Sequence, residues 1–345
     1  MRNPTCWQCL RRWGGPTLAA ALLLPAAPVQ ATTTCSADMT DVQFGFVDPF
    51  DGNVDVTATI DWSCTYSGFL GSLYASFVRM CFSVEDGVAG GGNCTPRRMT
   101  SGGNTMSFQL YRDSSRTSTW GSLTGCAGTE VQQTVSFALL SGNGTTKTGS
   151  LTVYGRVPSG QTALVPGLYS NSFSGSHTGL SYRYNEALLG LGTYPASCTS
   201  GGGGGGTDTF PFDATATVEA QCAPGFAVED IDFGTQGLLT ANIDTTATIS
   251  PQCTNTTPYQ IGLDDGLHAS GTTRRMQSSG GQYVTYELYR DSGRSQRWGN
   301  TENVDTVTGT GSGAVQPVTV YSRVSPQNTP AAGNYSDTVT VTIFY

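Results

Sequence analysis

Short stretches in which apolar and polar residues alternate recur along the whole chain. In 54–60 and 243–249, valine, alanine or isoleucine alternates with aspartate or threonine, which is typical of a strand with one buried face. The last eight residues, 338–345, repeat this alternation. The segments between such runs are rich in glycine, serine and asparagine, which favour turns. The pattern predicts an all-β protein built from many short strands.

One longer pattern occurs twice. Residues 108–121 read FQLYRDSSRTSTWG and residues 286–299 read YELYRDSGRSQRWG, with eight of fourteen positions identical. In each copy an alternating run leads into Arg-Asp-Ser, which is turn chemistry, and then into Trp-Gly. The repeated Arg and Asp could also form a binding pair, but we favour a structural turn. The repeat predicts two related β domains.

Two further blocks support the duplication. Residues 44–65 match 233–254, and residues 151–173 match 318–339, in the same order. We therefore expect an N-terminal domain at 32–199 and a C-terminal domain at 207–345. The first half carries extra residues around Cys81, Cys94 and Cys126, and a tail that ends at Cys198. Because insertions usually fall in loops, and loops often bind ligands, the first domain is predicted to be the specialised copy.

The boundary between the halves is marked by six consecutive glycines, 201–206. The run lacks the Lys-Ser or Lys-Thr of a phosphate-binding loop. Glycine-rich segments behave as flexible chains, so we predict a linker at 200–206.

The first 31 residues have the features of a signal peptide. Three arginines precede an apolar stretch, 18–28, which is too short to cross a bilayer and is followed by Val-Gln-Ala at 29–31. An uncleaved anchor is the alternative. Export would leave 14 basic residues against 25 acidic ones in the mature chain, because the three arginines leave with the signal. A surface of that sign repels phosphate backbones, so nucleic-acid binding is not expected.

Eight cysteines remain after removal of the signal peptide, an even number that predicts disulfides in an exported chain. Two pairs occupy matching places in the two halves, Cys35 with Cys64 and Cys222 with Cys253. For the other four we expect Cys81 with Cys94 and Cys126 with Cys198. Among these eight cysteines, close CxxC spacing and nearby histidines are missing, so neither a metal site nor a cofactor is expected.

Catalytic motifs are missing from the sequence as well. The two histidines, His177 and His268, stand at unmatched positions, and no serine, cysteine or aspartate sits in a recognisable nucleophile motif. The Asp-Asp-Gly sequence at 264–266 does not have calcium-loop spacing. The sequence therefore predicts a protein that is not an enzyme.

Several ordered motifs resemble one known family. YELYRDSGRSQRWGNT, VTVYSRV, the Gly-x-Tyr-x-Asp pattern and the closing TVTVTIFY are similar to the spore coat protein U domain, the pilin domain of archaic (Csu-type) chaperone–usher pili. The resemblance implies two immunoglobulin-like β-sandwich domains, the C-terminal one lacking its last strand. It also implies three assembly partners: a periplasmic chaperone, an outer-membrane usher and a next subunit that donates its N-terminal strand.

The resemblance assigns a role to the last alternating run. Val339, Val341, Ile343 and Tyr345 would form the open edge that accepts a donor strand. Only three residues precede Cys35 after the signal peptide, too few to donate a strand in turn. Such a subunit is expected at the tip of a pilus on the cell surface.

The first domain would then have to be completed by a strand from its own chain. One candidate is the segment 180–194. The other, which we favour, is the alternating run formed by Phe210, Phe212, Ala214, Ala216 and Val218.

The expected function is that of a tip adhesin that mediates surface attachment and biofilm formation, on an abiotic or a host surface. Apolar residues flanked by glycines are the candidate contact loops: Phe69, Leu70, Val88, Leu188, Leu189 and Leu191. A glycan-binding lectin would instead need aromatic residues around a pocket, for which Trp62, Trp120 and Tyr182 are available. A structural pilus or coat subunit without a ligand is the remaining alternative.

Overall fold

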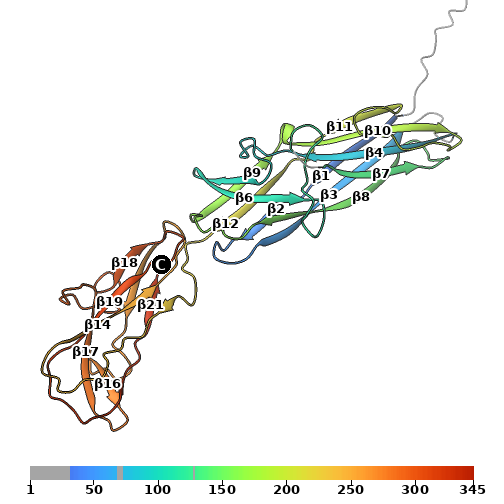
Figure 1. The fold of residues 1–345 in the computed structure, drawn as a ribbon. Helices are drawn as coiled ribbons and strands as arrows, with labels where there is room; N and C mark the ends of the chain where they lie inside the picture. Colours follow the sequence, from blue (N-terminus) through green and yellow to red (C-terminus); the bar gives the residue numbers. More distant parts are fainter. Residues whose placement is uncertain (1–31, 68–72, 127–128) are drawn as a thin grey trace, which may run out of the picture.

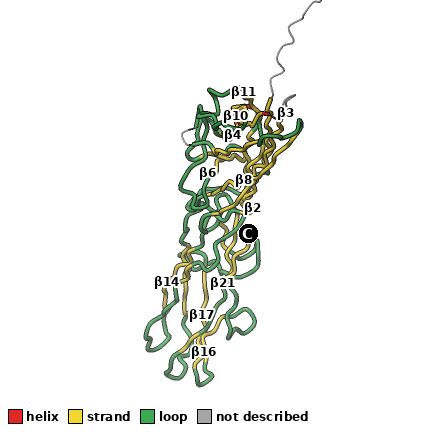
Figure 2. The backbone as a smooth tube through the Cα atoms, turned by 90° about the vertical axis from the view of Figure 1, so that its right-hand side faces the viewer, coloured by secondary structure: helices red, strands yellow, loops and turns green. Residues whose placement is uncertain are grey.

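The computed structural model describes residues 32–67, 73–126 and 129–345 of the 345-residue chain, and these form two β domains that lie end to end (Figure 1). Strands and loops make up the described part of both domains, which also contains a 3-10 turn at Gly175–His177 (Figure 2). Among the described residues, no helix is long and apolar enough to cross a membrane. The prediction of an all-β protein with two domains is confirmed.

The N-terminal domain is a sandwich of two sheets. The larger one has eight strands, in the order β1 (Thr32–Met39), β3 (Val54–Ser67), β8 (Thr145–Val157), β6 (Asn104–Tyr111), β5 (Arg97–Ser101), β9 (Gly167–Phe173), β12 (Phe212–Val218) and β2 (Val42–Phe46). The smaller one has the order β11 (Gly204–Asp208), β10 (Thr178–Leu188), β4 (Tyr74–Val84) and β7 (Val131–Phe137). The core lies between them.

The C-terminal domain repeats this plan with shorter strands. Its first sheet runs β13 (Ala227–Val228), β14 (Ile243–Ser250), β19 (Val318–Val324), β17 (Tyr283–Tyr289), β16 (Arg274–Ser278) and β20 (Tyr335–Ser336). Its second sheet runs β18 (Val307–Thr310), β15 (Pro258–Leu263) and β21 (Val341–Phe344). The pairings match strand by strand: β3 with β8 corresponds to β14 with β19, and β4 with β10 corresponds to β15 with β21.

The duplicated Arg-Asp-Ser motif is a structural turn in both domains. The carboxylate of Asp113 accepts hydrogen bonds from the Ser115 hydroxyl and from the backbone N–H groups of Thr117 and Ser118, and these bonds hold its pKa below the ordinary value. Asp291 caps the second copy through the N–H groups of Ser295 and Gln296. Both carboxylates therefore accept hydrogen bonds from residues of their own turn.

A second arginine, three residues after the aspartate in each copy of the repeat, joins the turn to the neighbouring strands. Arg116 and Arg294 have positive φ angles of 55° and 52°, and each guanidinium donates to carbonyl groups of two strands. The tryptophan that follows is fully buried in both copies. Trp120 donates its indole N–H to the Phe82 carbonyl, and Trp298 donates to the Ile261 carbonyl.

A buried arginine, which the sequence pattern did not indicate, links the two sheets at the same place in each domain. It is Arg97 in the first domain and Arg274 in the second. Arg97 is fully buried and donates to the carbonyls of Val84 and Trp120 and to the Gln109 side chain. Burial lowers the pKa of its guanidinium to about 10. Gln109 alternates with Phe108 and Leu110 along β6, and its side chain is also buried because it accepts a hydrogen bond from this arginine.

Two of the four disulfides have the predicted partners, Cys35–Cys64 and Cys222–Cys253. The other two pairs were predicted wrongly: the structure has Cys81–Cys198 and Cys94–Cys126 instead of Cys81–Cys94 and Cys126–Cys198. Cys81 lies within β4, and the extended strand carries the chain away from it before the loop with Cys94 begins. That loop meets the one containing Cys126, whose N–H donates to the Glu85 carboxylate at 2.9 Å.

The glycine run requires a second correction. Gly204–Gly206 belong to β11, which pairs with β10 from Leu180 to Tyr184, so the predicted flexible linker at 200–206 is wrong for these residues. The first domain extends to the end of β12, and residues 219–221 lead to Cys222 in the second. Across the junction, the Asn255 amide donates to the Ala163 carbonyl at 3.1 Å.

Candidate strand groove and hydrophobic end

Strands β11 and β12 act as one long strand that passes from the smaller sheet to the larger one. β11 pairs antiparallel with β10, and β12 pairs antiparallel with β9. Both parts of the long strand therefore pair with strands that come shortly before them in the chain. On its other side β12 pairs in parallel with β2. The favoured candidate for the strand that completes the first domain thus lies between β9 and β2. In the other candidate segment, residues 180–188 belong to β10.

The inward side chains of this long strand close the hydrophobic core. Phe210, Phe212, Ala214, Ala216 and Val218 are all buried, while the residues between them face outward or are half-buried. The Phe212 ring stacks on Phe173 with 4.5 Å between centroids, and the Phe210 ring stacks on Trp120 at 6.1 Å. The position of β12 is therefore set by core packing as well as by backbone hydrogen bonds.

The inward alternation continues into the glycines. Gly204 lies against the ring of Tyr184 and Gly206 against the ring of Tyr182, and a Cβ atom at Gly206 would be 2.5 Å from the tyrosine oxygen. Both tyrosines are buried. Glycine is needed here because the tyrosine rings fill the space that a side chain would occupy.

Replacing Gly204 by valine is expected to lower the stability of the first domain by about 1–3 kcal/mol, because the new side chain overlaps the Tyr184 ring. Thermal unfolding of the purified chain measures the change. Gly203→Ala is the matched control, since a Cβ there meets only the Tyr184 carbonyl, at 3.9 Å. Equal stability of the two variants would contradict this account of the glycine run.

The described part of the C-terminal domain has no strand at the position of β11 and β12. Strand β21 pairs only with β15, and β20 pairs only with β16, so the edge that β11 and β12 cover in the first domain is open in the second. The two edges correspond residue by residue: Tyr169 and Tyr335 each donate a hydroxyl hydrogen bond four residues back, to Val165 and Ala331.

Apolar side chains along this open edge are only partly buried. They contact the core without being enclosed by it, and they are Phe226, Ile231, Phe233, Met276, Tyr335, Val339, Val341 and Ile343. Phe173, the counterpart of Val339, is fully buried under β12. Three of the predicted edge residues belong to this set, and the fourth, Tyr345, is exposed. We call this row, from Tyr335 to Ile343 with Ile231 and Phe233 opposite, the strand groove.

A buried carboxylate anchors the groove strand. Asp337 accepts hydrogen bonds from the Tyr286 hydroxyl at 2.8 Å and from the backbone N–H of His268 at 3.1 Å, and the His268 ring lies 3.0 Å away. Burial, together with the bond to Asp337, raises the pKa of Tyr286. The first domain has Asn171 at this position, with its amide bonded to two backbone carbonyls.

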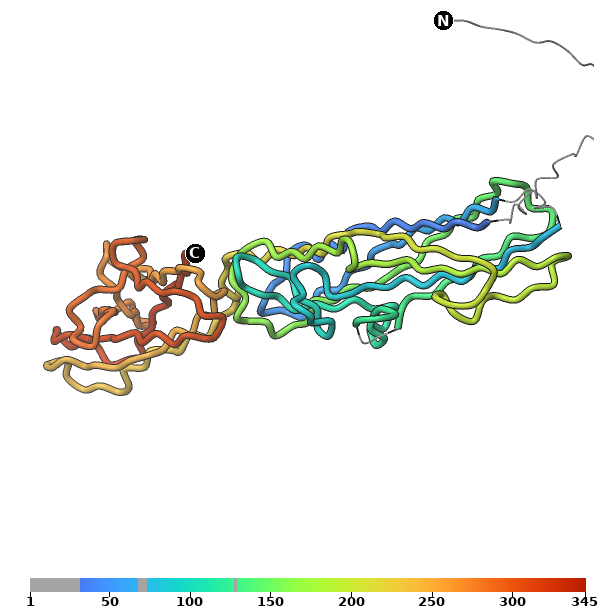
Figure 3. The backbone as a smooth tube through the Cα atoms, turned by 90° about the horizontal axis from the view of Figure 1, so that it is seen from above, coloured from blue at the N-terminus to red at the C-terminus, as the bar shows by residue number. Residues whose placement is uncertain are grey.

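The end of the first domain that points away from the second can be followed on the backbone in Figure 3. Six leucines are exposed where β3, β7 and β10 end there, at the end of β10 and in the β3–β4, β7–β8 and β10–β11 loops, and we call them the leucine end: Leu73, Leu139, Leu140, Leu188, Leu189 and Leu191. The loops touch one another, since the Leu189 N–H donates to the Leu73 carbonyl at 3.0 Å and Gly190 lies against the Leu139 side chain. Leu140 is 77% exposed and Leu191 is 91% exposed.

The structure brings together only some of the predicted loop residues. Leu188, Leu189 and Leu191 lie in the leucine end, while Phe69 and Leu70 fall outside the described residues. Val88 is exposed but lies elsewhere, in the β4–β5 loop, where its N–H donates to the Ser172 carbonyl of β9. Leu139 and Leu140 were missed, although they precede Ser-Gly-Asn-Gly much as Leu188 and Leu189 precede Gly-Leu-Gly.

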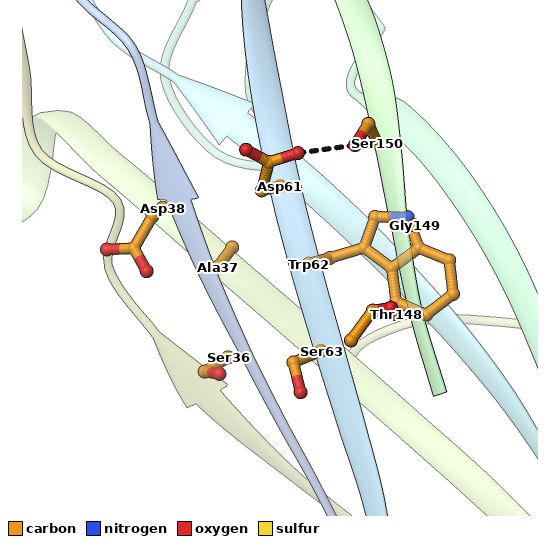
Figure 4. Close-up of a pocket in the computed structure, with 9 residues that line it drawn as sticks. All are labelled: Ser36, Ala37, Asp38, Asp61, Trp62, Ser63, Thr148, Gly149 and Ser150. Carbon is orange, nitrogen blue, oxygen red and sulfur yellow. Dashed lines mark hydrogen bonds between the residues drawn. The ribbon is translucent and has the colours of Figure 1, made fainter. Parts of the chain in front are cut away.

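The aromatic residues considered for a lectin site are not on the surface. Trp62, Trp120 and Tyr182 are all buried. A shallow hollow of about 290 Å³ lies over β1, β3 and β8, lined mostly by Asp38, Asp61 and serines. Figure 4 shows the Trp62 ring against Gly149 at this hollow, and the Asp61 carboxylate bonded to Ser150. The indole therefore packs on the sheet and does not form an aromatic platform.

Several titratable groups elsewhere lie beside a carboxylate or form a disulfide. His177 lies 3.2 Å from Asp86, and Arg297 lies 2.5 Å from Asp265, which belongs to the Asp-Asp-Gly sequence. Glu85, Cys94 and Cys126 come within metal-binding distance of one another, but the two cysteines form a disulfide. Behind the leucine end, burial raises the pKa of Glu186.

The sequence matches the family model of the Spore Coat Protein U domain twice, at residues 21–175 and 208–342. Protein U of Myxococcus xanthus is 33% identical over 154 residues, which cover 40% of this chain and 86% of that protein. Two matches to one domain model agree with the duplicated fold described above.

Solved structures of similar fold include a complex of the chaperone CsuC with the tip adhesion subunit CsuE from the archaic chaperone-usher Csu pili of Acinetobacter baumannii. The similarity has a TM-score of 0.50 at 18% identity and covers 90% of this chain and 100% of that one. The CupB6 tip adhesin of Pseudomonas aeruginosa aligns with a TM-score of 0.30 at 11% identity, over 90% of this chain and 93% of that one. At 18% identity the likeness to the CsuC–CsuE complex concerns the fold alone.

Proposed function

The chain belongs to the spore coat protein U domain family, and we propose that it is the tip adhesin of a chaperone–usher pilus, where it mediates surface attachment and biofilm formation. The observation that carries the proposal is the difference between its two domains. In the first domain, β11 and β12 of the same chain cover the edge that corresponds to the strand groove. In the second domain the strand groove is open. An open edge beside half-buried apolar residues favours the addition of a strand from another chain.

The arrangement of the two ends supports a terminal position in a fibre. The leucine end and the far end of the C-terminal domain lie at opposite extremities of the molecule (Figures 1 and 3). β12 fills the edge of the first domain and continues directly into the second domain. A donor strand in the strand groove would likewise continue into the body of the next subunit. Strand β1 pairs with β3 of its own domain and is not free for donation.

The proposed assembly partners follow from the same edge. A periplasmic chaperone would cover the groove first, an outer-membrane usher would receive the subunit, and the N-terminal strand of the next subunit would then occupy the groove. The solved complex of CsuC with CsuE pairs a chaperone with a tip subunit of similar fold, which supports the first of these steps.

The proposed ligand is an apolar surface, abiotic or on a host. Six leucines from three loops at one extremity form a larger apolar patch than the isolated hydrophobic residues of an ordinary soluble protein surface. The β4–β5 loop that carries Val88 would not take part.

Replacing Ile343 by aspartate is expected to remove the chain from assembled pili. Ile343 is already half-buried, so a donor strand that covers it gains part of the roughly 1.5–3 kcal/mol that full burial of an isoleucine contributes, and a charge in its place reverses that gain. Immunogold labelling of the wild-type chain should mark single fibre ends, and the variant should reduce end labels at least about tenfold.

The matched control is Thr338→Asp, which introduces the same charge on the exposed face of the same edge and should leave labelling unchanged. Gold particles spaced along the fibre shaft would instead identify a structural subunit. Normal end labelling of Ile343→Asp would show that this edge does not accept a strand.

A further inference from the structure

The segment after Leu188 does not project freely from the sheet. Residues 189–199, which we call the strap, turn back at the leucine end and cross the outer face of the smaller sheet over β10 and β4. The first residues of the strap supply Leu189 and Leu191 to the leucine end.

Four contacts attach the strap to the outward residues of these strands. The Asn185 amide donates to the Thr193 carbonyl at 2.8 Å, and Arg79 Nε donates to the Pro195 carbonyl at 2.6 Å. The Tyr194 ring packs edge-on against Phe77, with 5.5 Å between centroids. The Cys81–Cys198 disulfide closes the strap onto the middle of β4.

Close packing also fixes the turn of the strap. A Cβ atom at Gly192 would lie 2.6 Å from both the Phe77 ring and the Ala187 side chain, so the backbone rests directly on the sheet. Leu189 has a positive φ angle of 59°, a conformation that leucine rarely adopts without support from its surroundings. Leu191 is nevertheless 91% exposed, although Gly190 and Gly192 on either side of it pack closely against Leu139 and Phe77.

An unattached loop with two leucines would bury them against each other or against the sheet, because such collapse removes apolar surface from water. We propose that the strap, locked by the Cys81–Cys198 disulfide, holds Leu189 and Leu191 outward as a preorganised contact surface for apolar solids. This inference rests on the proposed adhesive function and adds its positioning residues: Phe77, Arg79, Tyr194 and the disulfide. Preorganisation favours binding because the ordering entropy of the loop is spent during folding.

The test removes the disulfide without leaving a free thiol. Pili carrying the Cys81→Ser/Cys198→Ser chain are expected to bind polystyrene at least about tenfold less than wild type, since several loop residues must then be ordered on contact. Thermolysin, which cleaves before leucine, should cut this variant at Leu189 or Leu191 in the folded state, where the wild type resists.

Cys94→Ser/Cys126→Ser is the matched control, because it removes one disulfide from the same domain without touching the strap. It should leave attachment and the thermolysin pattern unchanged. Tyr194→Ser keeps both disulfides and should weaken attachment in the same direction, which separates loss of the strap contacts from a general folding defect.

Attachment equal to wild type in the Cys81→Ser/Cys198→Ser pili, or an equal loss in both disulfide variants, would overturn the inference. The adhesive function itself is tested by a different change: charged substitutions at the leucine end must abolish attachment with the strap intact. If those substitutions abolish attachment and loss of the disulfide does not, the proposed function stands and the role of the strap is refuted.

Discussion

Replacing Phe212 by aspartate is expected to destabilise the first domain by at least ~4 kcal/mol. The phenyl ring stacks on Phe173 and is buried between β9 and β2, so its removal leaves a large cavity. The carboxylate that replaces it has no cationic partner in that apolar position, which adds the cost of a buried charge. A loss of this size is a large fraction of the stability of an ordinary domain.

Denaturant unfolding of the full mature chain, followed by tryptophan fluorescence, measures this effect. Trp62 and Trp120 report on the first domain and Trp298 on the second, so the early transition can be assigned. Thr215→Asp is the matched control, since it places the same charge on the outer side of β12 and should change stability by less than about 0.5 kcal/mol. If both variants unfold like the wild type, β12 does not complete the first domain.

Much of the architecture could be predicted from the alternation of the sequence and from its repeat. The pattern in 54–60 and 243–249 corresponds to β3 and β14, and the matched blocks gave the two domains. The Arg-Asp-Ser segment was interpreted as a turn because aspartate and serine bond their own backbone, and Asp113 does so. These features are local, or they are marked by duplication.

Features that depend on distant contacts were harder to predict. The glycine run has the composition of a linker, and it becomes a strand through its pairing with β10, whose Tyr182 and Tyr184 rings lie against Gly206 and Gly204. The pairing of Cys81 with Cys198 requires the strap to cross the sheet, which no sequence spacing indicates. In the sequence Leu139 and Leu140 are an ordinary apolar pair, and only the folded structure brings the Leu139 side chain against Gly190.

Aspartate at both Leu140 and Leu191 is expected to abolish attachment of otherwise normal pili to polystyrene. Each exposed leucine side chain can contribute about 1.5–3 kcal/mol when it is covered, so loss of two should weaken each contact by roughly 100-fold or more. Both side chains project into solvent, at 77% and 91% exposure, so their replacement should not affect folding.

The matched double variant is Val88→Asp/Leu238→Asp, which charges two exposed apolar residues, 66% and 77% exposed, outside the leucine end. Counting attached cells on polystyrene, at equal numbers of fibres per cell, compares the two variants directly. The proposed tip adhesin predicts background attachment for Leu140→Asp/Leu191→Asp and wild-type attachment for Val88→Asp/Leu238→Asp. Wild-type attachment by the Leu140→Asp/Leu191→Asp pili would contradict it.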